Sequence, residues 1–172
     1  MKKNLNTARL TRAALVAALY VVLTMISSMV GLSSGVIQCR LSEALTVLPA
    51  LMPEAIPGLV IGCVISNLLA NGVIWDVIFG SVATLIGAFG AYFIGRLGRR
   101  FYLLIPIPTV LSNALIVPLV LIYAYSVPDA YWFLFATVGI GEVISAGVFG
   151  TVLYKAIVSL PSDKLKFITK EK

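Results

Sequence analysis

The sequence predicts an all-α membrane protein with six transmembrane helices, and two observations carry this prediction. First, 60% of the 172 residues are hydrophobic and the mean hydropathy is +1.03, as is typical of integral membrane proteins. Second, every Lys and Arg except Arg40 falls into one of three clusters, which are separated by apolar sequence. The clusters are the N-terminal group of Lys2, Lys3, Arg9 and Arg12, the patch of Arg96, Arg99 and Arg100, and the tail over residues 155–172.

The basic clusters predict the parity of the membrane crossings. Lys and Arg near membrane ends concentrate on the cytoplasmic side, so all three clusters are expected inside. The chain must then cross an even number of times between successive clusters. Both termini are expected in the cytoplasm, and residues 1–172 are expected to form a single integral membrane domain. The alternative, a cleaved signal peptide at the N-terminus, would break this parity.

A hairpin broken by prolines is expected after the first helix, which is predicted over residues 9–30. The sequence over 41–72 is too long for one ordinary helix and contains several prolines, which remove backbone hydrogen bonds. We therefore expect a second helix over 41–52 and a third over 55–72. Glu54, at the inner turn between them, is expected to reach water.

Three further helices complete the predicted bundle. The fourth is expected over residues 75–95, which makes four crossings before the second basic cluster. Apolar runs over 102–124 and 130–158 follow, separated by the turn-forming sequence Ser126-Val127-Pro128-Asp129. These two runs predict an out-and-back hairpin that returns the basic tail to the cytoplasm.

Composition excludes several classes of function. The chain has no histidine, which excludes His-ligated zinc sites and His-based catalytic triads. Cys39 and Cys63 have no metal-ligand spacing, so we expect packing residues, with no metal site and no cofactor in this chain. The net charge of +6 comes from residues that flank membrane spans, so we expect contact with the lipid membrane and not with nucleic acid. We expect no enzymatic activity.

Three acidic residues and one arginine lie inside the membrane in this topology, where an ionisable side chain is costly and marks a candidate functional site. Arg40 and Glu43 begin the second helix from the outer side, and Asp76 begins the fourth from the same side. Glu142 lies about 18 Å below the outer start of the sixth helix, at ~1.5 Å per residue. It is the strongest candidate, because no cation is near it in sequence and the flanking glycines would let a ligand or a helix approach closely.

Simpler roles compete with ligand binding at these positions. Arg40 and Glu43 are spaced i and i+3, so an ion pair that only orders the loop is one alternative. Asp76 is also a candidate N-cap of the fourth helix. The aromatic residues at the same level, which include Trp75, Tyr125, Tyr131 and Trp132, fit an interfacial belt.

The outer polar layer indicates a pocket for a small molecule. Asn67 and Asn71, spaced i and i+4 on one face of the third helix, join the acidic residues, and no polar stripe continues inward. A carboxylate accepts two parallel N–H bonds from an amidine-like edge, and a flat ring stacks on aromatic side chains. We therefore expect a planar ligand rich in hydrogen-bond donors, with or without a positive charge.

Small residues at i, i+4 spacing form two sets of packing surfaces, because they let helices approach closely. In the fourth helix the spacing repeats through Ala83, Gly87, Ala91 and Gly95, and we expect packing within the chain. In the first helix two patterns overlap, and an exposed alanine face would dock a partner. These two patterns are Ala13 with Ala17 and Ala14 with Ala18.

Two blocks of sequence resemble the QueT family. Residues 39–51 read Cys-Arg-Leu-Ser-Glu-Ala-Leu-Thr-Val-Leu-Pro-Ala-Leu and precede Ile56-Pro57-Gly58-Leu59 and Gly62-Cys63, while residues 75–85 read Trp-Asp-Val-Ile-Phe-Gly-Ser-Val-Ala-Thr-Leu. The resemblance runs from the first helix to the sixth. It implies a substrate-binding S component of an energy-coupling factor (ECF) transporter, in the plasma membrane of a prokaryote, with queuosine precursors as cargo.

The resemblance also implies partners. An S component binds its vitamin-like ligand from outside and associates with a transmembrane coupling protein (EcfT) and two cytoplasmic ATPases, which drive release inside. The chain has no G-x-x-x-x-G-K-[ST] phosphate loop, so ATP is expected to be used by the partner subunits. The small-residue docking face of such proteins corresponds to Ala13, Ala14, Ala17 and Ala18.

The implied cargo is a 7-deazaguanine such as preQ0 or preQ1. In this hypothesis Glu142 or Glu43 takes the guanine-like N–H edge, and Asp76 takes a positively charged aminomethyl arm if the cargo has one. Amides satisfy the remaining ring donors and acceptors, and Trp75 offers a stacking face. The implied binding residues are Arg40, Glu43, Asn67, Asn71, Trp75, Asp76, Asn113 and Glu142.

Other functions stay open at the level of the sequence. The chain could be an S component for another small heterocyclic vitamin, or a stand-alone proton-coupled transporter with Glu142 as its switch. An intramembrane enzyme with an aspartyl-type dyad and a purely structural subunit are the remaining alternatives. The cost of keeping Glu142 in the membrane argues against the structural subunit.

Overall fold

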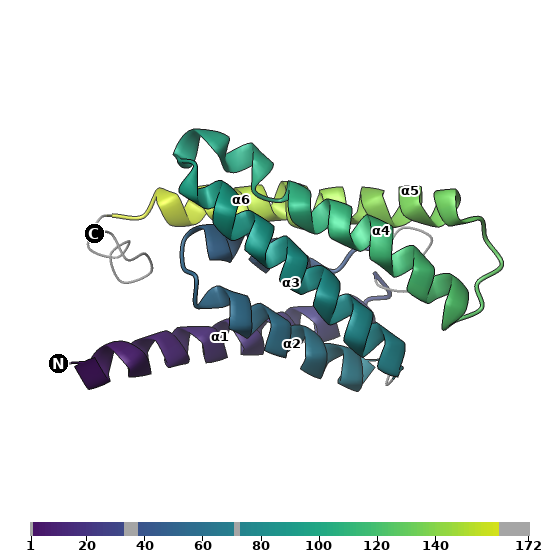
Figure 1. Ribbon diagram of the computed structural model, residues 1–172, viewed down its shortest axis with the longest axis horizontal. Coiled ribbons are helices and arrows are strands. Elements are labelled where there is room, and N and C mark those ends of the chain that lie inside the picture. Colours follow the sequence, from purple (N-terminus) through teal and green to yellow (C-terminus); the bar gives the residue numbers. More distant parts are fainter. Residues whose placement is uncertain (1, 33–37, 71–72, 162–172) are drawn as a thin grey trace.

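The computed structural model describes residues 2–32, 38–70 and 73–161, and within these residues the chain is a bundle of helices without strands (Figure 1). This confirms the all-α class. The elements in chain order are α1 (Lys2–Met29), η1 (Leu41–Ala50), α2 (Ala55–Ala70), α3 (Ile74–Arg96), η2 (Arg99–Leu104), α4 (Ile107–Tyr123), α5 (Tyr131–Glu142), η3 (Val143–Phe149) and α6 (Gly150–Val158).

Four segments of the described chain are long and apolar enough to cross a membrane: Thr7–Met29, Ile74–Arg96, Arg99–Tyr123 and Tyr131–Val158. The other two helices, η1 and α2, have 10 and 16 residues. At a rise of ~2.0 Å in a 3₁₀-helix and ~1.5 Å in an α-helix, their lengths are about 20 Å and about 24 Å, short of a ~30 Å hydrocarbon core. The count of six complete crossings therefore stays a prediction.

The proline-broken hairpin lies where the sequence predicts it. η1 ends at Ala50, the chain turns, and α2 begins at Ala55, with Pro57 in its first turn, where a missing N–H leaves no hydrogen bond unmade. The expectation that Glu54 reaches water is wrong. Arg12 of α1 pairs with the Glu54 carboxylate at 2.8 Å, and the Glu54 side chain is only 8% exposed. This ion pair ties the turn to the N-terminal half of α1.

Other boundaries differ from the prediction for local reasons. The helix expected from residue 102 begins at Ile107 after the short 3₁₀ segment η2, because Pro106 and Pro108 suit a helix start. The helix expected over 130–158 is continuous but includes a π-helical segment, η3, directly after Glu142. π-Helical segments are frequent at functional sites.

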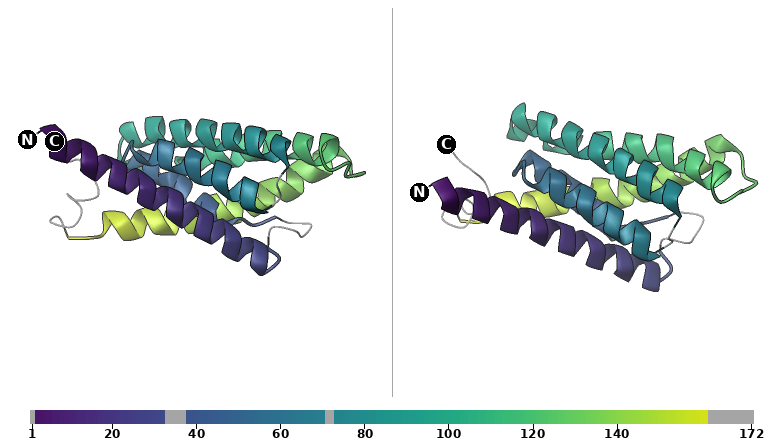
Figure 2. Two further views of the ribbon diagram at one scale, coloured as in Figure 1. Left: turned by 90° about the horizontal axis from the view of Figure 1, so that it is seen from below. Right: turned by 60° about the horizontal axis from the view of Figure 1, so that its bottom comes forward.

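The short helix η1 lies at the centre of the bundle. It is contacted by α1, α2, α3, η3 and α6, and most of its side chains are buried. Around it, α1 packs against α2, α3 against α4, and α4 against α5, as the views in Figure 2 show. The side chains of η1 are therefore surrounded by those of the neighbouring helices.

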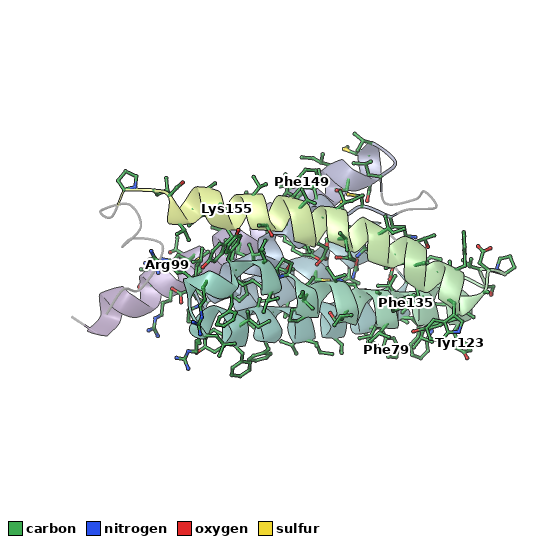
Figure 3. All side chains as sticks on the ribbon, turned by 90° about the horizontal axis from the view of Figure 1, so that it is seen from above. Phe79, Arg99, Tyr123, Phe135, Phe149 and Lys155 are labelled. Carbon is green, nitrogen blue, oxygen red and sulfur yellow. The ribbon has the colours of Figure 1, made fainter. Side chains whose placement is uncertain are left out.

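The start of α1 and the end of α6 lie at the same end of the bundle (Figure 1). Arg99 and Lys155 lie toward this end, whereas Phe79, Tyr123 and Phe135 lie toward the other (Figure 3). Arg99 belongs to the second basic cluster and Lys155 to the third. These members of the two clusters therefore lie at the end where α1 begins, as the predicted parity requires.

The two alanine patterns of α1 have different surroundings. Ala13 and Ala17 face α2, where a Cβ added at Gly58 would lie 2.5 Å from the Ala13 carbonyl oxygen and one added at Gly62 would lie 2.9 Å from that of Ala17. Ala14 and Ala18 are exposed. The interpretation of all four alanines as a docking face is therefore corrected: Ala13 and Ala17 pack within the chain, and the prediction is kept for the exposed pair.

The small residues of α3 pack within the chain, as predicted. A Cβ added at Gly87 would lie 2.9 Å from Cα of Thr109 in α4, and one added at Gly95 would lie 2.6 Å from Cα of Ala50 in η1. Ala83 and Ala91 are fully buried. Close approach at these positions brings α4 onto the middle of α3 and η1 onto its C-terminal end.

Candidate functional site

A small polar cavity lies among η1, α3, α4 and α5, near the end of the bundle opposite the start of α1. Five of the predicted binding residues meet at its wall, from segments far apart in the sequence. Glu43 is in the first turn of η1 and Asp76 is in the first turn of α3. The lining residues are Gln38, Arg40, Glu43, Asp76, Gly80, Thr84, Asn113, Val117, Val138 and Glu142.

Glu43 is held at the cavity by a residue that the sequence analysis did not select. Glu43 is 2% exposed, and its Oε1 accepts a hydrogen bond from the hydroxyl of Tyr20, which is fully buried in α1. The other oxygen, Oε2, has no partner within the described part of the chain. A buried acceptor without a partner is costly, so Glu43 presents an unmet acceptor at the cavity.

Glu142 presents a second unmet acceptor. It is 5% exposed, and its Oε2 also has no partner among the described residues. Asn113 lies beside both carboxyl groups, close enough to interact with each of them. Its Nδ2 makes no hydrogen bond of normal length and angle to any described residue. The two carboxyl groups thus lie close to each other and to one amide group, and one oxygen of each lacks a described hydrogen-bond partner.

Arg40 is fixed by an amide and not by Glu43. Its Nη1 donates to Oδ1 of Asn67 at 3.3 Å, and Nδ2 of Asn67 donates to the backbone carbonyl of Asp76 at 3.1 Å. Gly80 makes room for Asn67, since an added Cβ would lie 2.8 Å from Nδ2. The described residues contain no Arg40–Glu43 ion pair. The i, i+3 alternative is therefore wrong, because the Arg40 side chain turns toward α2.

Asp76 does not cap α3. The N-cap residue is Val73, so Asp76 lies in the first helical turn, where its charge suits the helix dipole. Oδ2 of Asp76 accepts a hydrogen bond from the hydroxyl of Tyr125 at 2.8 Å. Tyr125 is 38% exposed, so its place in an interfacial aromatic belt stays a prediction, and its hydroxyl also holds the Asp76 carboxylate.

Trp75 is not in the cavity wall. Trp75 is 53% exposed and stacks on Phe79, with ring centroids 5.9 Å apart. Both aromatic side chains line a separate apolar groove between α3 and α4, together with Tyr123. Asn71 lies outside the described residues. The stacking role expected for Trp75 would need a ligand outside the polar cavity.

A row of polar residues on one face of α1 is the sequence feature that could have identified Tyr20. Tyr20, Thr24 and Ser27 are spaced i, i+4 and i+7, so they share one helix face, and all three are buried. Of the other lining residues that sequence reasoning missed, Gln38 and Thr84 are polar side chains with no distinctive local pattern. Only their position in the bundle identifies them.

The segment before η1 is held against the Glu142 helix through Gly141. A Cβ added at Gly141 would overlap the backbone carbonyl oxygen of Gln38. Cys39 lies beside this contact, with Sγ 3.0 Å from the hydroxyl of Ser145 in η3. The glycine beside Glu142 is therefore approached by the chain itself, and this approach places Gln38 and Arg40 at the cavity.

The chemistry of the cavity favours a ligand that donates hydrogen bonds. Three carboxyl groups and one guanidinium line it, and both unpartnered carboxyl oxygens are acceptors. Its volume is about 20 Å³, room for about one water molecule. A ring-sized ligand therefore requires lining groups to move apart.

Replacing Gly141 by Ala is expected to displace residues 38–40 from α5, because the new Cβ would collide with backbone. Alkylation of Cys39, followed by mass spectrometry, should become several-fold faster than in the unmodified protein. The matched control is Gly139→Ala, where the added Cβ would make an ordinary contact of 3.7 Å with Ala114. Equal Cys39 reactivity in both variants would contradict the packing described for Gly141.

Comparison with known proteins agrees with this architecture. A family model described as QueT transporter matches residues 10–159, which cover all of the cavity residues and most of the chain. Searches of curated proteins and of solved structures returned no match. With apolar helices long enough to span a membrane, a family match over most of its length and a polar site enclosed among its helices, the chain belongs to the QueT transporter family.

Proposed function

We propose that this chain is the substrate-binding subunit of an ATP-driven ECF-type importer and captures a 7-deazaguanine such as preQ0 or preQ1 from outside the cell. The observation that carries the proposal is the pair of unpartnered carboxyl oxygens, Glu43 Oε2 and Glu142 Oε2, at one enclosed cavity. Buried acceptors are normally satisfied. A ligand with several N–H donors supplies what these two oxygens lack.

The guanine-like edge of a 7-deazaguanine suits the two unpartnered carboxyl oxygens of Glu43 and Glu142. Its ring N–H and exocyclic amine form a fork that one carboxylate accepts with two parallel bonds. Asn113 lies beside both carboxyl groups, and its Nδ2, which makes no hydrogen bond of normal geometry to a described residue, suits a ring carbonyl. We assign Glu43 or Glu142 to the N–H edge and Asp76 to a cationic arm, if the ligand carries one. Asn67 acts by holding Arg40.

Apolar contact with the ring faces would come from valines. Val117 of α4 and Val138 of α5 line the cavity between the polar groups. The proposal therefore contains no stacking contact with Trp75, whose ring lines the separate groove. Flat ligands are held between aliphatic side chains as well as between aromatic ones, because both faces of the ring leave water.

Coupling to the ATPases is proposed to use α1. Ala14 and Ala18 form an exposed small-residue face on the inner half of the helix, and such faces allow close approach of another helix. The transmembrane coupling protein would dock there. The proposal includes six crossings with both termini in the cytoplasm, and it assigns ATP hydrolysis to two partner ATPases.

The cargo is tested by calorimetric titration of the purified, folded protein with preQ0, preQ1, guanine and common heterocyclic vitamins. Tight stoichiometric binding of a deazaguanine alone is the expected result. Tight binding of a different heterocycle would keep the importer and change its cargo. Uptake in cells that lack the ATPases, abolished by collapse of the proton gradient, would instead favour a stand-alone proton-coupled transporter.

Glu43→Gln and Glu142→Gln are each expected to weaken deazaguanine binding by roughly 10- to 100-fold, since hydrogen bonds to charged groups contribute about 1.5–3 kcal/mol. Calorimetry measures this loss. Glu54→Gln is the matched control, because its carboxylate pairs with Arg12 at the inner turn, away from the cavity. If both cavity variants bind as tightly as the unmodified protein, the carboxylate assignment is wrong.

Ala18→Leu is expected to lower ligand uptake by roughly 5-fold or more while leaving ligand binding unchanged, because a larger side chain overpacks a close helix contact. Uptake of labelled ligand in cells and calorimetry on purified protein separate the two effects. Val152→Leu enlarges another exposed apolar side chain, on α6, and serves as control. Normal uptake by Ala18→Leu would exclude this face of α1 from docking.

A further inference from the structure

The buried face of α1 is polar where it meets η1. Thr24 donates to the hydroxyl of Ser42 at 2.8 Å, and the hydroxyl of Ser27 accepts from the backbone N–H of Leu41 at 3.0 Å. Tyr20 continues this line one turn earlier, with its hydroxyl on Glu43. Successive turns of one helix therefore hold successive residues at the start of η1, and α1 acts as a template for that segment.

The bond from Tyr20 makes the two oxygens of Glu43 different. Oε1 is occupied by the tyrosine hydroxyl, and Oε2 is left without a described partner. Tyr20 is 0% exposed and is not among the lining residues, and its hydroxyl connects to the cavity through Glu43. Without the hydroxyl, both oxygens would lack this donor, and the carboxyl group would be free to rotate or to turn toward Arg40.

We propose that Tyr20 is a positioning residue for ligand binding: by donating to Oε1, it presents Oε2 of Glu43 to the ligand in a fixed orientation. A fixed acceptor binds more tightly than a mobile one, because less rotational freedom is lost on binding. The inference rests on the proposed function of the cavity and adds to it a specific role for α1. The same helix carries the exposed Ala14 and Ala18 face on its other side.

Tyr20→Phe, titrated with preQ1 by calorimetry, tests the inference. The ring is retained and only the hydroxyl is lost, and the expected loss of affinity is roughly 10- to 100-fold. Tyr154→Phe is the matched control, since Tyr154 is also buried but stacks on Tyr102 toward the other end of the bundle. Thermal unfolding of each variant confirms that it is folded.

A double-mutant cycle distinguishes positioning from packing. If Tyr20 acts through the Glu43 carboxylate, its substitution should have a much smaller effect in a Glu43→Gln background than in the unmodified protein. Equal loss in both backgrounds would assign the effect to packing and overturn the inference. Unchanged affinity of Tyr20→Phe would overturn it as well, while leaving the proposed function intact.

A second measurement does not depend on the Tyr20 variant. In protein with ring-deuterated tyrosine and Tyr125→Phe, addition of preQ1 should shift a tyrosine band in the infrared difference spectrum. Glu43→Gln should abolish the shift even at a preQ1 concentration that saturates this weaker-binding variant. A shift that persists in Glu43→Gln would overturn the inference. If the folded, unmodified protein binds neither preQ1 nor any other ligand of the panel, the proposed function itself fails, and the inference fails with it.

Discussion

The arrangement of the bundle depends on how carboxyl groups are kept away from water. Burial of a charge is tolerated only when hydrogen bonds or an opposite charge compensate, and membrane surroundings make this requirement stricter. Glu43 meets it in part through Tyr20, and Asp76 through Tyr125. Arg40 is held by Asn67 at the cavity that both acids line. The compensation is incomplete at Glu43 and Glu142, and this incompleteness is what a ligand would use.

Close packing at glycine makes this polar centre possible. Gly58 and Gly62 bring α2 onto α1, Gly95 admits η1, and Gly141 admits the segment before η1. A Cβ at any of these positions would separate the elements that hold the polar groups. The tight 3₁₀ form of η1 places Glu43 inside the bundle, surrounded by α1, α2, α3, η3 and α6. The site is therefore a product of backbone proximity as much as of side-chain chemistry.

α1 has distinct surroundings on its different faces. One face is polar and buried against η1, another packs its small residues on α2, and a third is exposed at Ala14 and Ala18. A movement of η1 that accompanies ligand entry would thus be felt by α1 through direct hydrogen bonds. In a QueT family member this gives a physical connection between the cavity and the surface proposed for docking.

The sequence alone determined the features that depend on local properties. Hydropathy and prolines located the helices and the break before α2, and the rarity of intramembrane acids selected Glu43, Asp76 and Glu142. The tertiary structure decided the partners: Asn67 and not Glu43 for Arg40, Tyr20 for Glu43, and an apolar groove instead of the polar cavity for Trp75. It also divided the four alanines of α1 between an internal contact and an exposed face. These outcomes depend on the rotation of each helix about its axis and on the 3₁₀ form of η1. Residue spacing along one segment specifies neither of them, because both are set by packing against the other segments.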